Sequence, residues 1–255
     1  MMIWIGIFVL AWLIIMGLMS FLWVINFFRS EPNRIDLFWG IGPLIAGAIF
    51  LCHEEISPPR LYVLSLLGFW GGRLSAYAWL IHPIKPLNDK LHRVLQQKRF
   101  KNIYLFCHYQ VQGFWMVILA LPFLFIGRYE VEMGGLQFAL GTFVLSMIIS
   151  ESIADTQIYA FLSEKKPGIY QEGLWQYARH PNYWFEGLMW LGFGFMACQV
   201  TYGWIGLISP VVYYFVATEK WLPLMERGLL ERDSAEYESY QKSVPAFWFG
   251  FKKSG

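Results

Sequence analysis

Charged residues are scarce in this chain. Asp, Glu, Lys and Arg make up only 15% of its 255 residues, against about a quarter in an ordinary soluble domain. Hydrophobic residues account for 56% and aromatic residues for 19%, with 13 Trp, 14 Tyr and 22 Phe. This balance excludes a water-soluble globule and is typical of lipid-facing helices with aromatic residues at both interfaces. The sequence therefore predicts an integral membrane protein.

Cysteine is also rare, and basic residues form no nucleic-acid-binding run. The three cysteines, Cys52, Cys107 and Cys198, are widely spaced and include no Cys-x-x-Cys pair, so we expect neither a disulfide framework nor a metal site. The net charge is only +2, and no run of Lys and Arg alternates with polar residues, so we expect no nucleic-acid partner. Nothing in the sequence indicates an obligate protein partner.

Long apolar stretches are abundant. They are continuous rather than alternating, which favours helices over an outer-membrane barrel. The first one begins without Lys or Arg and is too long for the apolar part of a signal peptide, so we expect it to be retained as a spanning helix. The predicted fold is all-α, a single polytopic membrane helix bundle over residues 1–255 with about seven transmembrane helices. The predicted spans cover residues 3–28, 37–52, 61–81, 103–126, 136–162, 183–200 and 202–216.

Basic residues predict the orientation, because cytoplasmic loops carry an excess of Lys and Arg. Seven spans divide the loops into two sets, one of which holds 17 of the 20 Lys and Arg residues. The other set holds only Arg60 and Arg128, and Arg73 lies inside the third span. We therefore expect the N-terminus outside and the C-terminus in the cytoplasm. The basic loops are residues 29–36, 82–102, 163–182 and 217–255.

Polar side chains inside the predicted spans gather in their cytoplasmic halves. Three pairs have the spacing of four that places both residues on one helix face, and the second span opens with Asp36. Ionisable residues inside a membrane are costly and indicate a functional site, although hydrogen bonds between helices are an alternative. We expect one site that opens to the cytoplasm. The pairs are Arg73 with Tyr77, Glu151 with Asp155, and Asn182 with Glu186.

The start of the sixth span has the features of a phosphate site. Pro181 suits the first turn of a helix, so the free backbone N–H groups and the positive end of that helix would face the cytoplasm beside Arg179 and His180. The alternative is that Arg179 only follows the charge bias of cytoplasmic loops and that His180 caps the helix. The residues alone leave both interpretations open.

Several of these motifs together resemble the steroid 5-alpha-reductase superfamily, most of all its bacterial membrane proteins. The resemblance covers residues 36–247 and is looser over the tail. The matching runs are DLFWG at residues 36–40, GRL at 72–74, ESIADTQ at 151–157 and GLWQYARHPNYWFE at 173–186.

The resemblance implies an integral protein of the bacterial cell membrane with reductase activity. Such an enzyme takes NADPH from the cytoplasm and delivers hydride to a carbon–carbon double bond conjugated with a carbonyl. Asn182 and Glu186 match the polar pair on the nicotinamide side, and Asp155 matches an acidic cofactor contact. The set of residues that we expect to bind the cofactor is Glu151, Asp155, Arg179, His180, Asn182, Tyr183 and Glu186.

The chain also departs from the superfamily. The basic residue expected one to two turns after Asp155 is absent, and Lys165 or Lys166 would have to replace it for a preference for the 2′-phosphate. The Gln-Glu-Leu-Pro element of the steroid enzymes is not found at the start of the second span.

Conjugate reduction also needs a proton donor near the substrate oxygen. We expect Tyr77 to be that donor, polarised by Arg73 and oriented by Asp36; the alternative is that Tyr77 is an interfacial aromatic residue. The apolar outer half of the bundle suits a lipid or sterol-like substrate that enters from the bilayer.

Two other functions fit parts of the sequence. Arg-His-Pro-x-Tyr also resembles membrane methyltransferases of the isoprenylcysteine and phospholipid type, in which Arg179, His180, Glu219 and Glu226 would hold S-adenosylmethionine. A non-catalytic or transport protein would place Arg73 and Glu186 along an ion path, but the outer half lacks polar groups for it. The tail of residues 217–255 is expected to lie along the cytoplasmic membrane surface.

Overall fold

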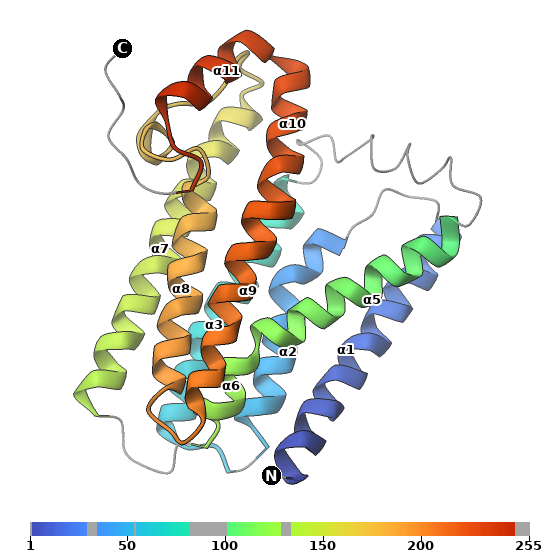
Figure 1. Cartoon of the computed structure of the whole chain (residues 1–255), viewed down its shortest axis with the longest axis vertical. Coiled ribbons are helices and arrows are strands. Elements are labelled where there is room, and N and C mark those ends of the chain that lie inside the picture. The colour runs from blue at the N-terminus through green and yellow to red at the C-terminus, as the bar shows by residue number, and fades with distance from the viewer. Residues whose placement is uncertain (1, 30–34, 54, 82–100, 129–133, 248–255) are drawn as a thin grey trace.

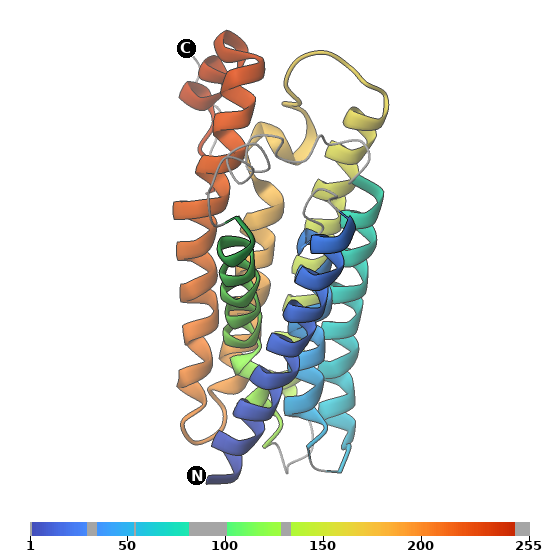
Figure 2. The ribbon, with the colours of Figure 1, turned by 90° about the vertical axis from the view of Figure 1, so that its right-hand side faces the viewer.

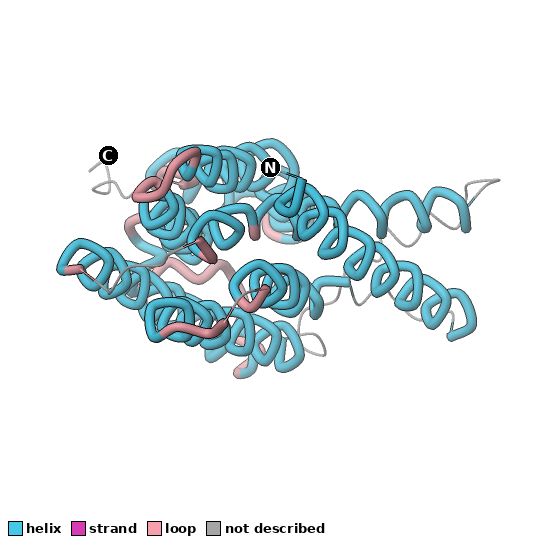
Figure 3. Tube along the Cα trace, turned by 90° about the horizontal axis from the view of Figure 1, so that it is seen from below, coloured by secondary structure: helices cyan, strands magenta, loops and turns pink. Residues whose placement is uncertain are grey.

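The computed structural model describes residues 2–29, 35–53, 55–81, 101–128 and 134–247, and over these residues the chain forms helices and loops without a strand (Figure 3). All-α architecture, as predicted, is thus found throughout the described residues. The elements are α1 (Met2–Arg29), η1 (Ile35–Leu37), α2 (Phe38–Leu51), α3 (Pro58–Ile81), α5 (Lys101–Leu119), α6 (Leu121–Ile126), α7 (Gly135–Ser163), η2 (Gly173–Gln176), α8 (Pro181–Ala197), η3 (Gly203–Leu207), α9 (Ile208–Val216), a π turn (Ala217–Trp221), α10 (Leu222–Arg232) and α11 (Ser234–Ser243).

Successive long helices run in alternating directions along the molecule (Figure 1). Helix α7 packs along α8, α2 along α3, and α1 along α5. In Figure 2 the pair α1 and α5 lies toward the viewer, and α9 continues into α10 at the left-hand edge. The ends of α3 and α7 lie at the same end of the bundle as the starts of α2 and α8 (Figure 1).

Each predicted span falls on helix, but two of them differ from the prediction. The fourth is interrupted at Ala120, where α5 ends and the short, buried α6 begins. Pro122 sits in the first turn of α6, and because proline has no N–H and clashes with the preceding turn, one continuous helix cannot form there. The seventh begins with the 3₁₀ turn η3 before it becomes the α-helix α9.

Two helices are long and apolar enough to cross a membrane by length and composition, Ile3–Phe28 and Gly135–Ser163. Phe38–Leu51 is a shorter apolar helix. Only 17% of the most apolar window of Ile3–Phe28 and 22% of that of Gly135–Ser163 are buried inside the bundle. Large apolar side chains of α1, including Ile3, Leu13 and Phe28, are more than half exposed.

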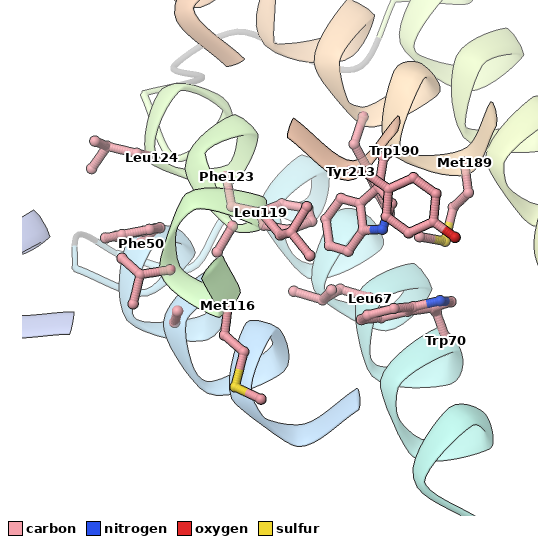
Figure 4. Packing of buried hydrophobic residues seen from close by; sticks show 14 of the residues in the cluster. Phe50, Leu67, Trp70, Met116, Leu119, Phe123, Leu124, Met189, Trp190 and Tyr213 are labelled. Carbon is pink, nitrogen blue, oxygen red and sulfur yellow. The ribbon is translucent and has the colours of Figure 1, made fainter. Parts of the chain in front are cut away.

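The apolar core joins α3, α6 and α8. Trp70 of α3 packs edge-on against Trp190 of α8, with ring centroids 5.0 Å apart, and Phe123 of α6 packs against Phe193 at 4.8 Å. Figure 4 shows Trp70, Phe123 and Trp190 gathered with Tyr213. Trp70 precedes Arg73 by less than one helical turn, so this core ends where the polar residues of α3 begin.

The tail forms the π turn, α10 and α11, and its position along a membrane surface stays a prediction. The π turn joins α9 to α10, and α10 continues in the direction of α9 (Figure 1). Helix α11 then folds back, and Tyr237, Tyr240 and Val244 form a small second core with Ile169 and residues of α10. Residues 82–100 of the predicted loop 82–102 and residues 248–255 at the end of the tail lie outside the described residues.

Candidate functional site

A buried arginine joins α3 to α7. Arg73 Nη1 donates to Asp155 Oδ2 at 2.6 Å, and Arg73 Nη2 pairs with Glu151 Oε1. Asn182 Nδ2, in the first turn of α8, donates to Asp155 Oδ1 at 3.1 Å. Three helices that are far apart in the sequence thus meet through these four residues, which we name the Arg73 cluster.

The sequence places these side chains together for simple reasons. Glu151 and Asp155 are four residues apart on α7, so both face the same neighbours, and they are only 1% and 3% exposed. Carboxylates buried to this degree need a cation or several hydrogen-bond donors. Arg73 supplies the cation from α3.

Two buried acceptors of the Arg73 cluster have no hydrogen-bond partner among the described residues. They are Glu151 Oε2 and Asn182 Oδ1. Buried oxygens are nearly always hydrogen-bonded, so a pair without partners at one site is suited to accept N–H or O–H groups of a ligand.

The structure describes the side chain of Tyr77 but not that of Asp36. Tyr77, one turn after Arg73 on α3, lies within electrostatic range of Arg73, Glu151 and Asp155, so the structure brings it to the Arg73 cluster. Asp36 lies in η1 immediately before α2, but its side chain lies outside the part of the chain that is described.

Glu186 lies one turn deeper along α8 than Asn182. Its Oε2 is 2.9 Å from the hydroxyl of Tyr213 on α9, and its Oε1 accepts from Trp190 Nε1 at 3.4 Å. Glu186 is also within electrostatic range of Arg73, Glu151 and Asp155. Sequence reasoning missed Tyr213, because a single tyrosine in an apolar helix has no partner at helical spacing that would mark it.

The loop before α8 is anchored on α7. Gln157 Oε1 accepts from Leu174 N at 3.0 Å, and Trp175 Nε1 donates to Ala154 O at 3.1 Å. Gly173 has a φ of +59°, and a Cβ there would collide with the Gln157 amide. Gln157 of the motif at 151–157 therefore has a structural task, which is to fix the loop that leads to Arg179.

Arg179 and His180 form a second cluster, which we name the tail clasp. Glu226 Oε1, on α10, accepts from Arg179 Nε at 2.9 Å and lies 3.1 Å from His180 Nε2. Arg179 Nη1 also donates to Val244 O at 2.6 Å, and Gln241 Nε2 donates to Glu226 Oε2 at 2.9 Å.

The tail clasp changes the interpretation of the start of α8. The backbone N–H of Arg179 donates to Pro245 O at 2.9 Å, and that of His180 donates to Ala246 O at 3.0 Å. Helix α8 does begin at Pro181, as predicted. In this conformation residues of the tail occupy donors of Arg179 and His180, and a phosphate site at the start of α8 stays a prediction.

Charge pairing sets the ionisation of Glu226. Its partial burial would raise the pKa of the carboxyl group, but the hydrogen bonds from His180 and Arg179 and the charge of Arg179 outweigh that effect and lower the pKa to about 2. Glu226 is therefore a carboxylate at neutral pH.

The remaining predicted residues lie around these two clusters. The hydroxyl of Tyr183 donates to Met225 Sδ at 3.3 Å, and its ring stacks on Trp221 at 5.9 Å. Lys166 pairs with Glu164 on the surface, and Lys165 is exposed. Among the described residues, no group of three or more His, Cys, Asp or Glu side chains could hold a metal ion.

Comparison with known proteins identifies a family but no individual relative. The chain matches the family described as "Protein of unknown function (DUF1295)" over residues 22–244. No curated protein and no solved structure matches it. The match includes both the Arg73 cluster and the tail clasp, and this chain belongs to the DUF1295 family.

Proposed function

We propose that this protein is a membrane oxidoreductase that uses NADPH from the cytoplasm to reduce a carbon–carbon double bond conjugated to a carbonyl. The observation that carries the proposal is the Arg73 cluster. Motifs from α3, α7 and α8 that resemble the steroid 5-alpha-reductase superfamily meet there through contacts between Arg73, Glu151, Asp155 and Asn182.

A seven-span membrane arrangement belongs to the same proposal. Exposed apolar side chains on α1 and α7 suit lipid and would be unusual in water. The alternating helix directions (Figure 1) agree with the partition of 17 of the 20 Lys and Arg residues to one set of loops. The N-terminus then lies outside, and the Arg73 cluster lies in the cytoplasmic half of the bilayer.

The Arg73 cluster fits one end of the cofactor. A nicotinamide carries a carboxamide whose two N–H groups need acceptors, and Glu151 Oε2 and Asn182 Oδ1 are buried acceptors without partners. The phosphate end fits less directly, because the tail clasp holds Arg179 and Glu164 pairs with Lys166. Binding of the phosphates would therefore draw on Arg179 after it leaves Glu226.

The protein residues would then act on the substrate by position and charge. Bound NADPH supplies the hydride. Tyr77, beside Arg73, is placed to donate a hydrogen bond to the substrate carbonyl oxygen as negative charge grows on it. A lipid or sterol-like substrate would reach this point from the bilayer.

One observation favours a second candidate function, a membrane methyltransferase that uses S-adenosylmethionine. Arg179, His180 and Glu226 converge in the tail clasp, as that alternative requires. Glu219, its fourth residue, lies exposed on the π turn. The Arg73 cluster has no task in that reaction, so we rank the methyltransferase second.

Cofactor binding separates the two functions. The purified protein in detergent would be titrated calorimetrically with NADPH, NADH and S-adenosylmethionine. We expect NADPH to bind, Asp155→Asn to weaken binding about tenfold or more, and Ser152→Ala to leave it unchanged, because Ser152 only bonds back to Ile148 O on the same helix. Binding of S-adenosylmethionine alone would reverse the ranking.

Activity provides the second test. NADPH oxidation would be followed with two enone probes, cholest-4-en-3-one and a linear long-chain 3-en-2-one. Product analysis should show saturation of the double bond with the ketone intact. Tight NADPH binding without reduction of either probe would point to another acceptor class.

A further inference from the structure

The hydroxyl of Tyr213 has two acceptors within reach and only one hydrogen. Its oxygen is 2.9 Å from Glu186 Oε2 and 3.2 Å from the backbone oxygen of Tyr183. If the hydroxyl donates to both oxygens, they share its one hydrogen in a three-centre bond. If Glu186 is protonated and donates to the tyrosine oxygen, the hydroxyl can donate fully to Tyr183 O. The geometry therefore suits a neutral, protonated Glu186.

The charge count around Glu186 favours the same state. The groups that face it are Arg73 from α3, Glu151 and Asp155 from α7, and the neutral donors Trp190 and Tyr213. Three carboxyl groups thus share one described cation. Arg73 directly contacts the two carboxyl groups of α7. An uncompensated charge in an apolar interior is costly, so the carboxyl group without a cation contact is the one that keeps a proton.

A buried donor marks the side where a ligand oxygen would fit. Trp70 is 1% exposed, and its Nε1 has no hydrogen-bond partner among the described residues. Its ring packs on Trp190, whose own Nε1 donates to Glu186. Figure 4 shows Trp70, Trp190 and Tyr213 grouped in the core. The N–H of Trp70, which has no partner among the described residues, is suited to donate a hydrogen bond to a ligand oxygen that lies next to the Glu186–Tyr213 pair.

We propose that Glu186 and Tyr213 form a buried proton-donating pair for the reduction, with Tyr213 as the group that reaches the substrate. The inference rests on the proposed reductase function. It assigns Tyr213 a catalytic task that sequence reasoning gave to Tyr77, and it gives Glu186 the task of storing the proton.

The step balances as follows. The Arg73 cluster would hold the nicotinamide, which would supply a hydride to the β carbon of the substrate and so convert the conjugated carbonyl into an enolate. Tyr213 gives its hydroxyl proton to the α carbon, which restores the carbonyl. Glu186 gives its proton to the tyrosinate oxygen, and a proton from the cytoplasm restores Glu186.

Infrared spectroscopy tests the stored proton without cofactor or substrate. The purified protein at neutral pH should show a carboxylic acid C=O band that shifts in D₂O. Glu186→Gln should remove this band, and Tyr213→Phe should shift it because the hydrogen bond to the phenol is lost. Glu238→Gln, on the exposed face of α11, is the matched control and should change nothing. A band that is absent from the wild type, or unchanged in Glu186→Gln, would overturn the proposal.

Single-turnover kinetics with cholest-4-en-3-one test the transfer itself. Glu186→Gln and Tyr213→Phe should slow NADPH oxidation by about 100-fold or more, the usual contribution of a general acid, and should abolish the solvent isotope effect. Wild-type rates in Tyr213→Phe together with slow turnover in Tyr77→Phe would assign the proton to Tyr77 and refute the proposal. Absence of NADPH binding by the wild type would instead refute the reductase function, and the infrared result would still decide whether Glu186 holds a proton.

Discussion

At the scale of single residues, Arg73 is the cation that balances the negative charge of two buried carboxyl groups. One guanidinium pairs with two carboxyl groups that are almost completely buried. Removing the cation leaves those charges in an apolar interior, which costs far more than the ion pairs gain on their own.

Arg73→Met should therefore destabilise the protein strongly. We expect the free energy of unfolding to fall by about 3–5 kcal/mol, measured by thermal unfolding in detergent. Arg227→Met is the control, because Arg227 is exposed on α10 and surface arginines contribute about 1 kcal/mol or less. Equal losses in both variants would contradict a special role for Arg73.

Sequence reasoning at this scale located most of the Arg73 cluster. The spacing of four on α7 and the depth of Arg73 predicted that Arg73, Glu151 and Asp155 share one site, but not that the two carboxyl groups pair with Arg73. The same reasoning could not find Tyr213 or Trp70, because an aromatic residue in an apolar span looks the same whether it faces lipid, core or a carboxyl group.

At the scale of helices, α2 and α3 approach each other closely at two glycines. A Cβ on Gly40 would collide with Gly71 O, and a Cβ on Gly71 would lie 2.6 Å from Gly40 O. Backbone is in the way on both sides, so no side chain can move to relieve the overlap. This contact fixes α3 against α2 just before Arg73, and so it positions the site.

Gly71→Ala should separate the two helices. We expect a loss of about 1–3 kcal/mol from overpacking and weaker NADPH binding, measured by thermal unfolding and calorimetry. Gly68→Ala, one turn earlier on α3, has nothing within 4 Å of the new Cβ and should be neutral or slightly stabilising, since alanine is the better helix former. If Gly68→Ala were the more damaging of the two, the close contact would not be what matters.

Helix positions were largely predictable, whereas their interruptions were only partly so. Apolarity placed α1 and α7 within two residues of their observed bounds, because long and mostly apolar runs strongly favour one continuous helix. Pro122 signals the break at Ala120. We nevertheless predicted one continuous span there, because the residues around Pro122 are apolar. The π turn at Ala217–Trp221 has no local signal, because it depends on how Trp221 packs against Trp39 and Tyr183.

At the scale of the whole molecule, the tail is tied to the start of α8 over a large sequence separation. Arg179 and Glu226 are 47 residues apart. Composition alone indicated an interfacial segment, and neither helix periodicity nor charge bias can pair two residues this distant. The structure therefore supplied what the sequence did not, namely that the tail bonds to the residues that directly precede α8.

The tail clasp should open in acid. The folded pKa of Glu226, about 2, lies below its ordinary value of 4.5, so the released carboxyl group binds protons more readily than the clasped one. The stabilisation is therefore complete above about pH 4.5 and is lost as the pH falls toward 2. A spin label on Ser239→Cys should become more mobile over this range. In Glu226→Gln the label should be mobile already at pH 7, and an unchanged acid transition in that variant would contradict the assignment.

Cysteine labelling tests the proposed orientation. Cys198 is exposed at the end of α8, at the end of the bundle that is proposed to face outward. With Cys52 and Cys107 replaced by Ser, an impermeant maleimide should label Cys198 in intact cells. A variant carrying Ser239→Cys as its only cysteine should react only after lysis. The opposite pattern would invert the topology.

The tail clasp has a consequence for how the protein is made. The ribosome completes α8 long before it reaches Glu226 and Val244, so the guanidinium of Arg179 lacks these tail partners until the last part of the described chain has been synthesised. Every helix that contributes to the Arg73 cluster is already available by then. A nascent chain would thus be able to form the Arg73 cluster first and the tail clasp last, and a product truncated before α10 would never form the tail clasp.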